Sequence, residues 1–211
     1  MNLEQFQVLI TGIVDDQRQK ESTAFIQELQ SSQYPLYVQL LIETIAQYLQ
    51  NNPMISPVSC KLAITLALKE VQSKRIFQDQ AFALQFLQTF SPMVTPILQS
   101  NIEDNFKKNT ATILALLHVY IFQMNQNVSI PEYLLKEFND IPNLRRYWIY
   151  CISEIAVNDP NFGGFSMEML LTILQTEGNE DLYSPKMHLF FSMATAHPDD
   201  QTLHSMLPVF F

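Results

Sequence analysis

Glycine is scarce in this sequence, with 4 residues in 211. Phosphate-binding loops need glycines that let backbone N–H groups approach an anion. The one adjacent pair, Gly163–Gly164, is followed by no Lys-Ser or Lys-Thr, so we expect a turn there and no nucleotide-binding loop. Runs of alternating β-branched residues bounded by hairpin turns are also missing, which favours helix over sheet.

Cysteine and histidine are few, and their spacing indicates no metal site. Both cysteines, Cys60 and Cys151, fall in expected helices, so we expect buried free thiols and a reducing compartment. The histidines are His118, His188, His197 and His204. None has a second His or Cys three or four residues away, as zinc ligands do. Because recognised nucleophile motifs are missing as well, we expect no metal, no cofactor and no enzymatic activity.

Positive charge is limited, with 12 Lys+Arg against 21 Asp+Glu and a net charge of −9. An acidic protein repels phosphate backbones, so no direct nucleic-acid partner is expected. The charge can attract basic proteins over long range, or it can simply keep the protein in solution. The longest apolar stretch, Ile113–Phe122, contains His118 and is too short to span a bilayer, so no membrane insertion is expected.

Hydrophobic residues make up 47% of the chain and recur at helical spacing in five pairs of runs. The second runs begin near Asp16, Ser56, Asp104, Asn143 and Ser184. These starts are about 40, 48, 39 and 41 residues apart, which is the period of two-helix HEAT repeats. The sequence therefore predicts an all-α fold, a right-handed α-solenoid (α-α superhelix) of about five HEAT-type helix pairs that holds other proteins.

The expected repeats within a single domain of residues 1–211 cover about 2–31, 34–72, 78–125, 129–158 and 165–197, with a sixth starting at 200. In the third repeat, Ser91–Pro92 is expected to end an extra helix, and Pro96 to kink the next one. In the fourth, Ser129 and Glu132 predict a capping box. The apolar end at Phe210–Phe211 leads us to expect the amino-terminal part of a longer chain, with a terminus that folds back as the alternative.

Basic residues fall on the second helices of several pairs. They are Lys61, Lys69, Lys107, Lys108, Arg145 and Arg146. Second helices line the concave side of a HEAT array, so these residues are expected to form a sparse ladder there, with simple solvation as the alternative for each. Trp148 lies on a second helix too, where core packing is expected and an interface anchor is the alternative.

The opening of the chain combines a leucine-rich helix, an acidic turn, a helix with Arg/Lys and leucine-x-x-leucine spacing, and Tyr-Pro. It reads FQVLITGIVDDQRQKESTAFIQELQSSQYPLYVQLL, and CKLAITLALKEV follows in the second repeat. These stretches resemble the amino-terminal region of the importin-β (karyopherin-β) nuclear transport receptors, with Lys69 at a matching basic position. Leu144–Arg145 and SPKMHLFFSMATAHPDDQTLHSMLPVFF are similar to the branch that carries ribosomal proteins and histones. Ser22–Thr23 and Ile76–Phe77 depart from the family pattern.

The resemblance implies a fragment of a nuclear transport receptor, present in cytoplasm and nucleus, that carries protein cargo through the nuclear pore. In this family the second helices of the first repeats receive the small GTPase Ran in its GTP state, and Ran then releases the cargo. Phe-Gly nucleoporins bind between adjacent first helices. By position, Lys61, Lys69, Lys107 and Lys108 are the Ran-facing candidates, and a basic protein is the expected cargo. A HEAT-repeat scaffold that organises a protein complex without Ran is the alternative.

Overall fold

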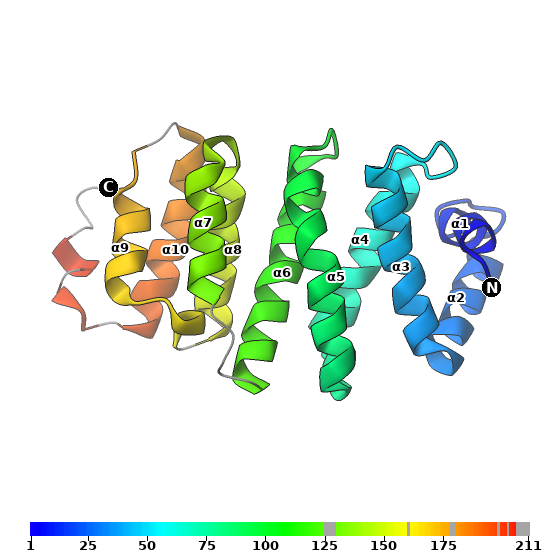
Figure 1. Cartoon of the computed structure of the whole chain (residues 1–211), viewed down its shortest axis with the longest axis horizontal. Coiled ribbons are helices and arrows are strands. Elements are labelled where there is room, and N and C mark those ends of the chain that lie inside the picture. Colours follow the sequence, from blue (N-terminus) through cyan, green and yellow to red (C-terminus); the bar gives the residue numbers. More distant parts are fainter. Residues whose placement is uncertain (125–129, 160, 178–179, 198, 202, 206–211) are drawn as a thin grey trace. The chain divides into compact units, whose positions relative to one another are not determined.

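The computed structural model describes residues 1–124, 130–159, 161–177, 180–197, 199–201 and 203–205. These residues form helices and turns and contain no β-strand, so the expected all-α fold is confirmed (Figure 1). The chain divides into two compact units. The first unit is Met1–Ile76 with Gln88–Thr110, and the second unit is Phe77–Leu87 with Ala111–Phe211.

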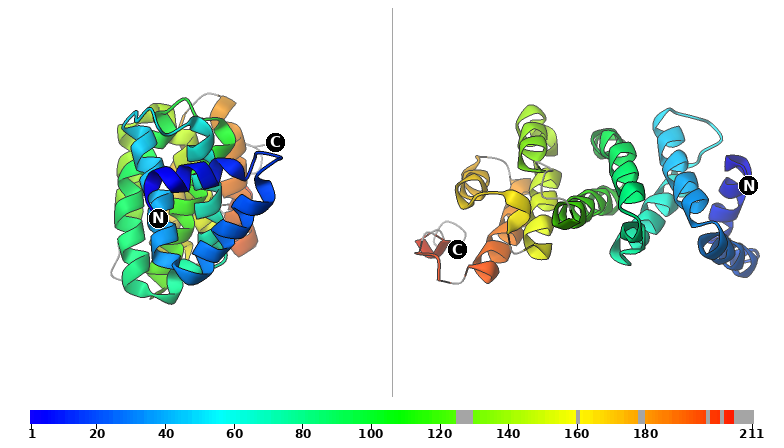
Figure 2. Two further views of the ribbon diagram at one scale, coloured as in Figure 1. Left: turned by 90° about the vertical axis from the view of Figure 1, so that its right-hand side faces the viewer. Right: turned by 60° about the horizontal axis from the view of Figure 1, so that its bottom comes forward.

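The first unit begins with two helix pairs. They are α1 (Leu3–Gly12), α2 (Gln19–Ser32), α3 (Tyr34–Leu49) and α4 (Pro57–Gln72), followed by the short 3₁₀ helix η1 (Arg75–Gln78). α1 packs against α2, α3 and α4, and α3 packs against α2 and α4 (Figure 2). Local caps explain two of the starts, because Asn2 accepts a hydrogen bond from the Gln5 N–H and Ser56 accepts one from the Ser59 N–H. The second helices expected near Asp16 and Ser56 are confirmed within three residues.

Two longer helices, α5 (Gln80–Gln99) and α6 (Asp104–Met124), contribute residues to both units. α5 runs through Pro92 and Pro96 without interruption, so the expected helix end at Ser91–Pro92 is wrong. Both prolines are exposed, whereas the other sides of the helix are buried. The buried side chains are Ala83, Phe86, Leu87, Phe90, Met93, Val94, Ile97 and Leu98. Burying them favours the continuous helix by more than the two missing backbone hydrogen bonds cost.

Replacing Pro96 by alanine is expected to stabilise the protein by about 2 kcal/mol, since it restores a backbone donor and a better helix former at an exposed position. Pro57→Ala is the matched control. Pro57 occupies the first turn of α4, where proline is favourable, and the change should stay within about 0.5 kcal/mol. Urea unfolding followed by circular dichroism measures both. Equal effects at the two positions would show that the α5 proline costs the helix nothing.

α5 is also long and apolar enough to cross a membrane, judged by length and composition over the described residues. The stretch that meets these criteria is therefore Gln80–Gln99 and not Ile113–Phe122. In the most apolar 18-residue stretch of α5, 44% is buried inside the structure. A core helix of a soluble protein meets the same criteria, so this feature is weak evidence for a membrane span.

The second unit continues with shorter helices. They are α7 (Ile130–Asp140), η2 (Pro142–Leu144), α8 (Arg145–Asn158), η3 (Phe162–Gly164), α9 (Met167–Gln175), η4 (Glu180–Leu182) and α10 (Tyr183–Ala196). α8 packs against α7 and α10, and α10 also packs against α9. The starts expected near Asn143 and Ser184 are confirmed within two residues. Ser129 of the expected capping box and the terminal Phe210–Phe211 lie outside the described residues.

The turn expected at Gly163–Gly164 is confirmed, and its geometry requires the glycines. Phe162, Gly163 and Gly164 have φ angles of 53°, 60° and 87°, so three consecutive residues adopt left-handed conformations. The buried carboxylate of Asp159 accepts hydrogen bonds from the backbone N–H groups of Asn161 (3.1 Å) and Gly163 (2.9 Å). This side chain therefore satisfies two backbone donors of the turn that follows α8.

Candidate protein-binding site

All four candidate lysines lie in the first unit. Lys61 and Lys69 are on α4, and Lys107 and Lys108 are in the first turns of α6. Lys69 lies eight residues beyond Lys61, or about 12 Å along the helix axis. The structure therefore places the candidates on two helices of one compact unit, at separate points along them.

Lys61 already has partners within the chain. Its ammonium forms an ion pair with the carboxylate of Glu103 and lies 5.7 Å from the centroid of the Phe106 ring. The hydrogen bond from Lys61 holds the pKa of Glu103 below its ordinary value. This ion pair therefore links α4 to the residues just before α6, and a partner would have to compete with Glu103 for Lys61.

The remaining lysines differ in how freely they can meet a partner. Lys108 forms a 3.1 Å ion pair with Asp104, one turn earlier on α6. Exposed pairs of this kind contribute about 0.3–0.5 kcal/mol, so a partner can displace it cheaply. Lys107 is partly buried. Lys69 is exposed in the last turn of α4, where a cation complements the helix dipole.

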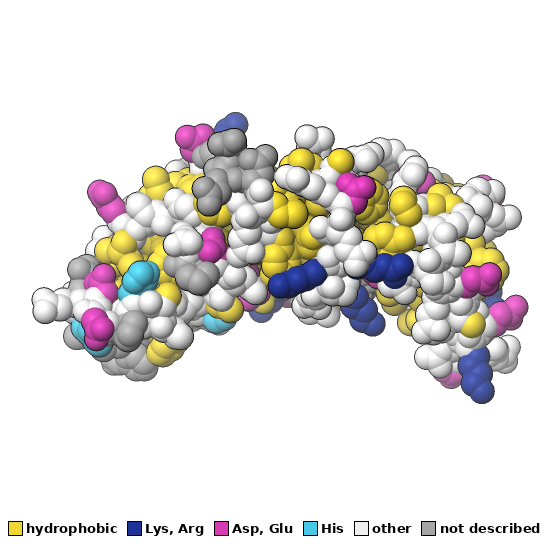
Figure 3. Space-filling view, turned by 90° about the horizontal axis from the view of Figure 1, so that it is seen from below, with side chains coloured by type: hydrophobic (Ala, Val, Ile, Leu, Met, Phe, Trp, Pro, Cys, Tyr) yellow, Lys and Arg dark blue, Asp and Glu magenta, His cyan; other side chains and the backbone are white. Residues whose placement is uncertain are grey.

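The surface around these lysines is mixed rather than strongly basic, because Glu103 and Asp104 accompany Lys61 and Lys108. Figure 3 shows Lys and Arg side chains as separate dark-blue groups, with Asp and Glu side chains in magenta on the same face. Among the described residues, the structure shows no acidic partner for Lys69, which is exposed. Electrostatic recognition at this site would therefore depend most on Lys69.

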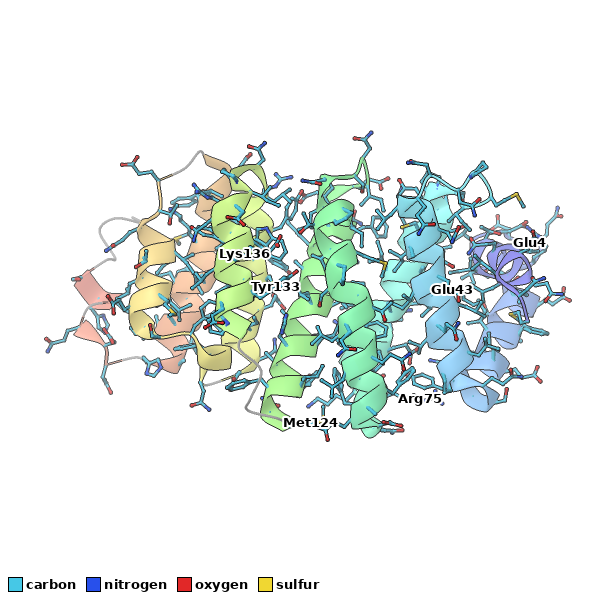
Figure 4. All side chains as sticks on the ribbon, in the orientation of Figure 1. Glu4, Glu43, Arg75, Met124, Tyr133 and Lys136 are labelled. Atoms are coloured by element: carbon cyan, nitrogen blue, oxygen red, sulfur yellow. The ribbon has the colours of Figure 1, made fainter. Side chains whose placement is uncertain are left out.

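A buried polar network in the first unit has no counterpart in the sequence-based expectations. The carboxylate of Glu70 on α4 is buried and accepts a hydrogen bond from the Gln30 amide on α2. Arg75 (Figure 4) donates to the backbone carbonyl oxygen of Gln30 at 2.8 Å. Its guanidinium also lies 4.3 Å from the centroid of the Tyr34 ring. Burial, together with the nearby Glu70 charge, raises the pKa of Tyr34 and Tyr37. The network joins α2, α3, α4 and η1.

The expected free, buried thiols are confirmed, and their environment makes them poor nucleophiles. Neither Cys60 nor Cys151 forms a disulfide, and both are buried. Burial raises the pKa of Cys60 to about 12, and it also raises the pKa of Cys151. The thiolate is the reactive form, so neither sulfur is activated at neutral pH.

In the second unit, Ser153 and His188 are close enough to suggest a nucleophile and its base. The Ser153 Oγ lies 2.8 Å from the His188 Nδ1 and also 2.8 Å from the Tyr150 carbonyl oxygen. A carbonyl can only accept, so the single hydroxyl hydrogen goes to Tyr150, and His188 must donate to Ser153. Ser153 is also fully buried. The pair is therefore a structural bond between α8 and α10 and does not activate the serine.

Over the described part of the chain, no group of three or more His, Cys, Asp and Glu side chains is placed to hold a metal ion. His118 is buried, and Trp148 is buried as the sequence predicts.

The consecutive helix pairs define an all-α protein with a helical repeat-like architecture. No protein-family model matches the chain, and no curated protein or solved structure shows significant similarity to it. Membership of the importin-β family therefore stays a prediction drawn from the residues of the opening segment.

Proposed function

We propose that this protein is an importin-like nuclear transport receptor, with its helix pairs stacked as HEAT repeats in a right-handed solenoid. The first unit would bind a Ran-type GTPase in its GTP state, and the receptor would carry a basic protein cargo. The observation that supports the proposal is that α1 to α4 begin and end close to where the sequence of the importin-like opening predicts helices. The net charge of −9 supports a basic cargo.

Within this proposal the four lysines contribute unequally. An acidic surface of the GTPase would compete with Glu103 for Lys61 and with Asp104 for Lys108. Lys69 is exposed and carries its charge without such competition, so its contact would add most to the affinity.

Replacing Lys69 by glutamate is expected to weaken Ran-GTP binding by about tenfold or more, because an attraction becomes a repulsion. Lys108→Glu should have a smaller effect, because Lys108 already pairs with Asp104. Lys136→Glu makes the same charge change at an exposed site on α7 of the second unit and is the control (Figure 4). Calorimetric titration with Ran loaded with GTP or GDP measures all variants.

The unmodified chain is expected to bind the GTP form of Ran and to bind the GDP form much more weakly. Equal binding of both forms, or binding of neither, would contradict the transport proposal. If the Lys136 variant loses as much affinity as the Lys69 variant, net charge and not the α4 surface accounts for the effect.

A HEAT-repeat scaffold that works without Ran is the second candidate. The ion pairs of Lys61 and Lys108 favour it, because they reduce the basic surface offered to a partner. Isolation of one stoichiometric protein complex whose formation does not depend on nucleotide would support the scaffold against the receptor.

A further inference from the structure

The first unit has an apolar groove between α1 and α2, with a volume of about 590 Å³. Its apolar lining is Met1, Val8, Leu9, Phe25 and Leu29. Val8 and Phe25 are exposed to 57% and 44%, which is high for side chains that no partner covers. Glu28 has the one charged side chain of the lining. The groove therefore offers an apolar floor with a negative charge at its edge.

A second groove lies on the other side of α1, against the connection between α3 and α4, with a volume of about 880 Å³. Val8 belongs to the lining of both grooves, so they meet at one exposed side chain. Met54 and Ile55 supply further apolar surface, and Glu4, which projects from α1, is the one charged residue here (Figure 4). Both grooves thus have one carboxylate and no cationic side chain, and the second groove has more amide and hydroxyl side chains than the first.

One residue of the second groove has a buried side-chain oxygen that receives no hydrogen bond. Gln7 belongs to its lining and is 8% exposed. Thr44 donates its hydroxyl hydrogen to the Leu40 carbonyl oxygen at 2.8 Å, so the Gln7 amide nitrogen must donate to the Thr44 oxygen, 2.6 Å away. This arrangement fixes the amide with its Oε1 unpartnered. A buried acceptor without a donor is costly, and because this oxygen is closed to solvent it is a cost within the fold and not a contact offered to a ligand.

The helix amino-termini beside this groove do not make it an anion site. Asn2 and Ser56 accept hydrogen bonds from the Gln5 and Ser59 N–H groups, so two of the backbone donors there are already used. An anion would also meet Glu4 without a lysine, arginine or histidine in the lining. The groove is therefore suited to a group that donates hydrogen bonds and carries positive charge.

We propose that the two grooves form one docking surface for an extended segment of a partner protein that carries a large apolar side chain next to an arginine. The apolar side chain would enter the α1–α2 groove. The arginine would cross Val8, lay its stem against Met54 and Ile55, and pair with the exposed carboxylate of Glu4. Arginine suits a carboxylate better than lysine, because its planar guanidinium can donate two parallel hydrogen bonds. None of the four candidate lysines lines either groove, so this surface is independent of the Ran proposal.

A peptide with adjacent phenylalanine and arginine in a Gly-Ser background tests the proposal. Its binding to the full chain is followed by NMR, with citrulline in place of arginine as the neutral control of the same shape. We expect shifts confined to residues of the two linings and a loss of about tenfold in affinity with citrulline. Absence of binding, or equal binding of the two peptides, would overturn the proposal.

Two variants locate the effect on the surface. Glu4→Gln and Glu28→Gln, both at exposed positions, are each expected to weaken binding of the arginine peptide by about threefold. Glu21→Gln removes the same charge from an exposed position on α2 outside both linings and should leave the affinity unchanged. An equal loss in all three variants would show a general charge effect and would contradict a docking surface at α1.

Discussion

Replacing Trp148 by alanine is expected to lower the free energy of unfolding by about 4 kcal/mol. Trp148 is fully buried on α8, which packs against α7 and α10. Its ring meets the Tyr133 ring edge-on, with centroids 6.4 Å apart and an interplanar angle of 87°. Truncation removes this contact and leaves a cavity that helices on both sides cannot fill, and such losses amount to about 3–5 kcal/mol.

Trp148→Phe separates lost volume from lost hydrogen bonding. The Trp148 Nε1 makes no hydrogen bond, so phenylalanine forfeits none and keeps most of the apolar contact. We expect a loss of about 1–2 kcal/mol for this variant. Because the chain has one tryptophan, urea unfolding must be followed by circular dichroism for all variants. An alanine variant less than about 1 kcal/mol below the unmodified protein would contradict the tight packing at this position.

Lowering the pH from 6.5 to 4 is expected to cost about 3 kcal/mol of stability through His118 alone. Burial lowers the pKa of His118 from 6.5 to about 4, and neither ring nitrogen has a hydrogen-bond partner. Between pH 6.5 and pH 4, His118 is protonated in the unfolded chain and neutral in the folded chain. The contribution is therefore complete above pH 6.5, falls by about 1.4 kcal/mol per pH unit below it, and levels off below pH 4.

His118→Leu is expected to remove this dependence, because leucine keeps the apolar contacts without a titrating group. The comparison is restricted to pH 6.5–4.5, above the range in which Glu103 and Asp15, whose pKa values are lowered, become protonated. Equal slopes for the unmodified protein and the His118 variant in urea unfolding would contradict a neutral, buried imidazole.

The helices themselves could be predicted from sequence because their signals are local. Ser56 and Pro57 lie next to each other at the start of α4 and supply the cap and the first-turn proline. The apolar stripe of α6 and the turn at Gly163–Gly164 also depend on residues close together in the chain. The helix end expected at Ser91–Pro92 is wrong because the signal that decides it is not local. Whether a helix tolerates proline depends on which side is exposed, and distant residues decide that.

The candidate site shows the same division between local and distant information. The sequence could place Lys61 on a second helix, but it could not show the ion pair with Glu103, because the two residues are 42 positions apart. Glu70 stands beside Lys69 in the chain and has no sequence feature that marks it as buried. Gln7 likewise gives no local sign that it lies against Thr44, 37 residues away.

The sequence by itself determined that this protein is helical and where most of its helices begin, since caps, turns and apolar spacing act within a few residues. Only the tertiary structure decided which polar groups are buried, which lysines are already paired and where α1 borders two grooves. Burial and long-range pairing arise when segments far apart in the chain pack together. Their cost or benefit depends on that packing and not on the identity of the neighbours in sequence.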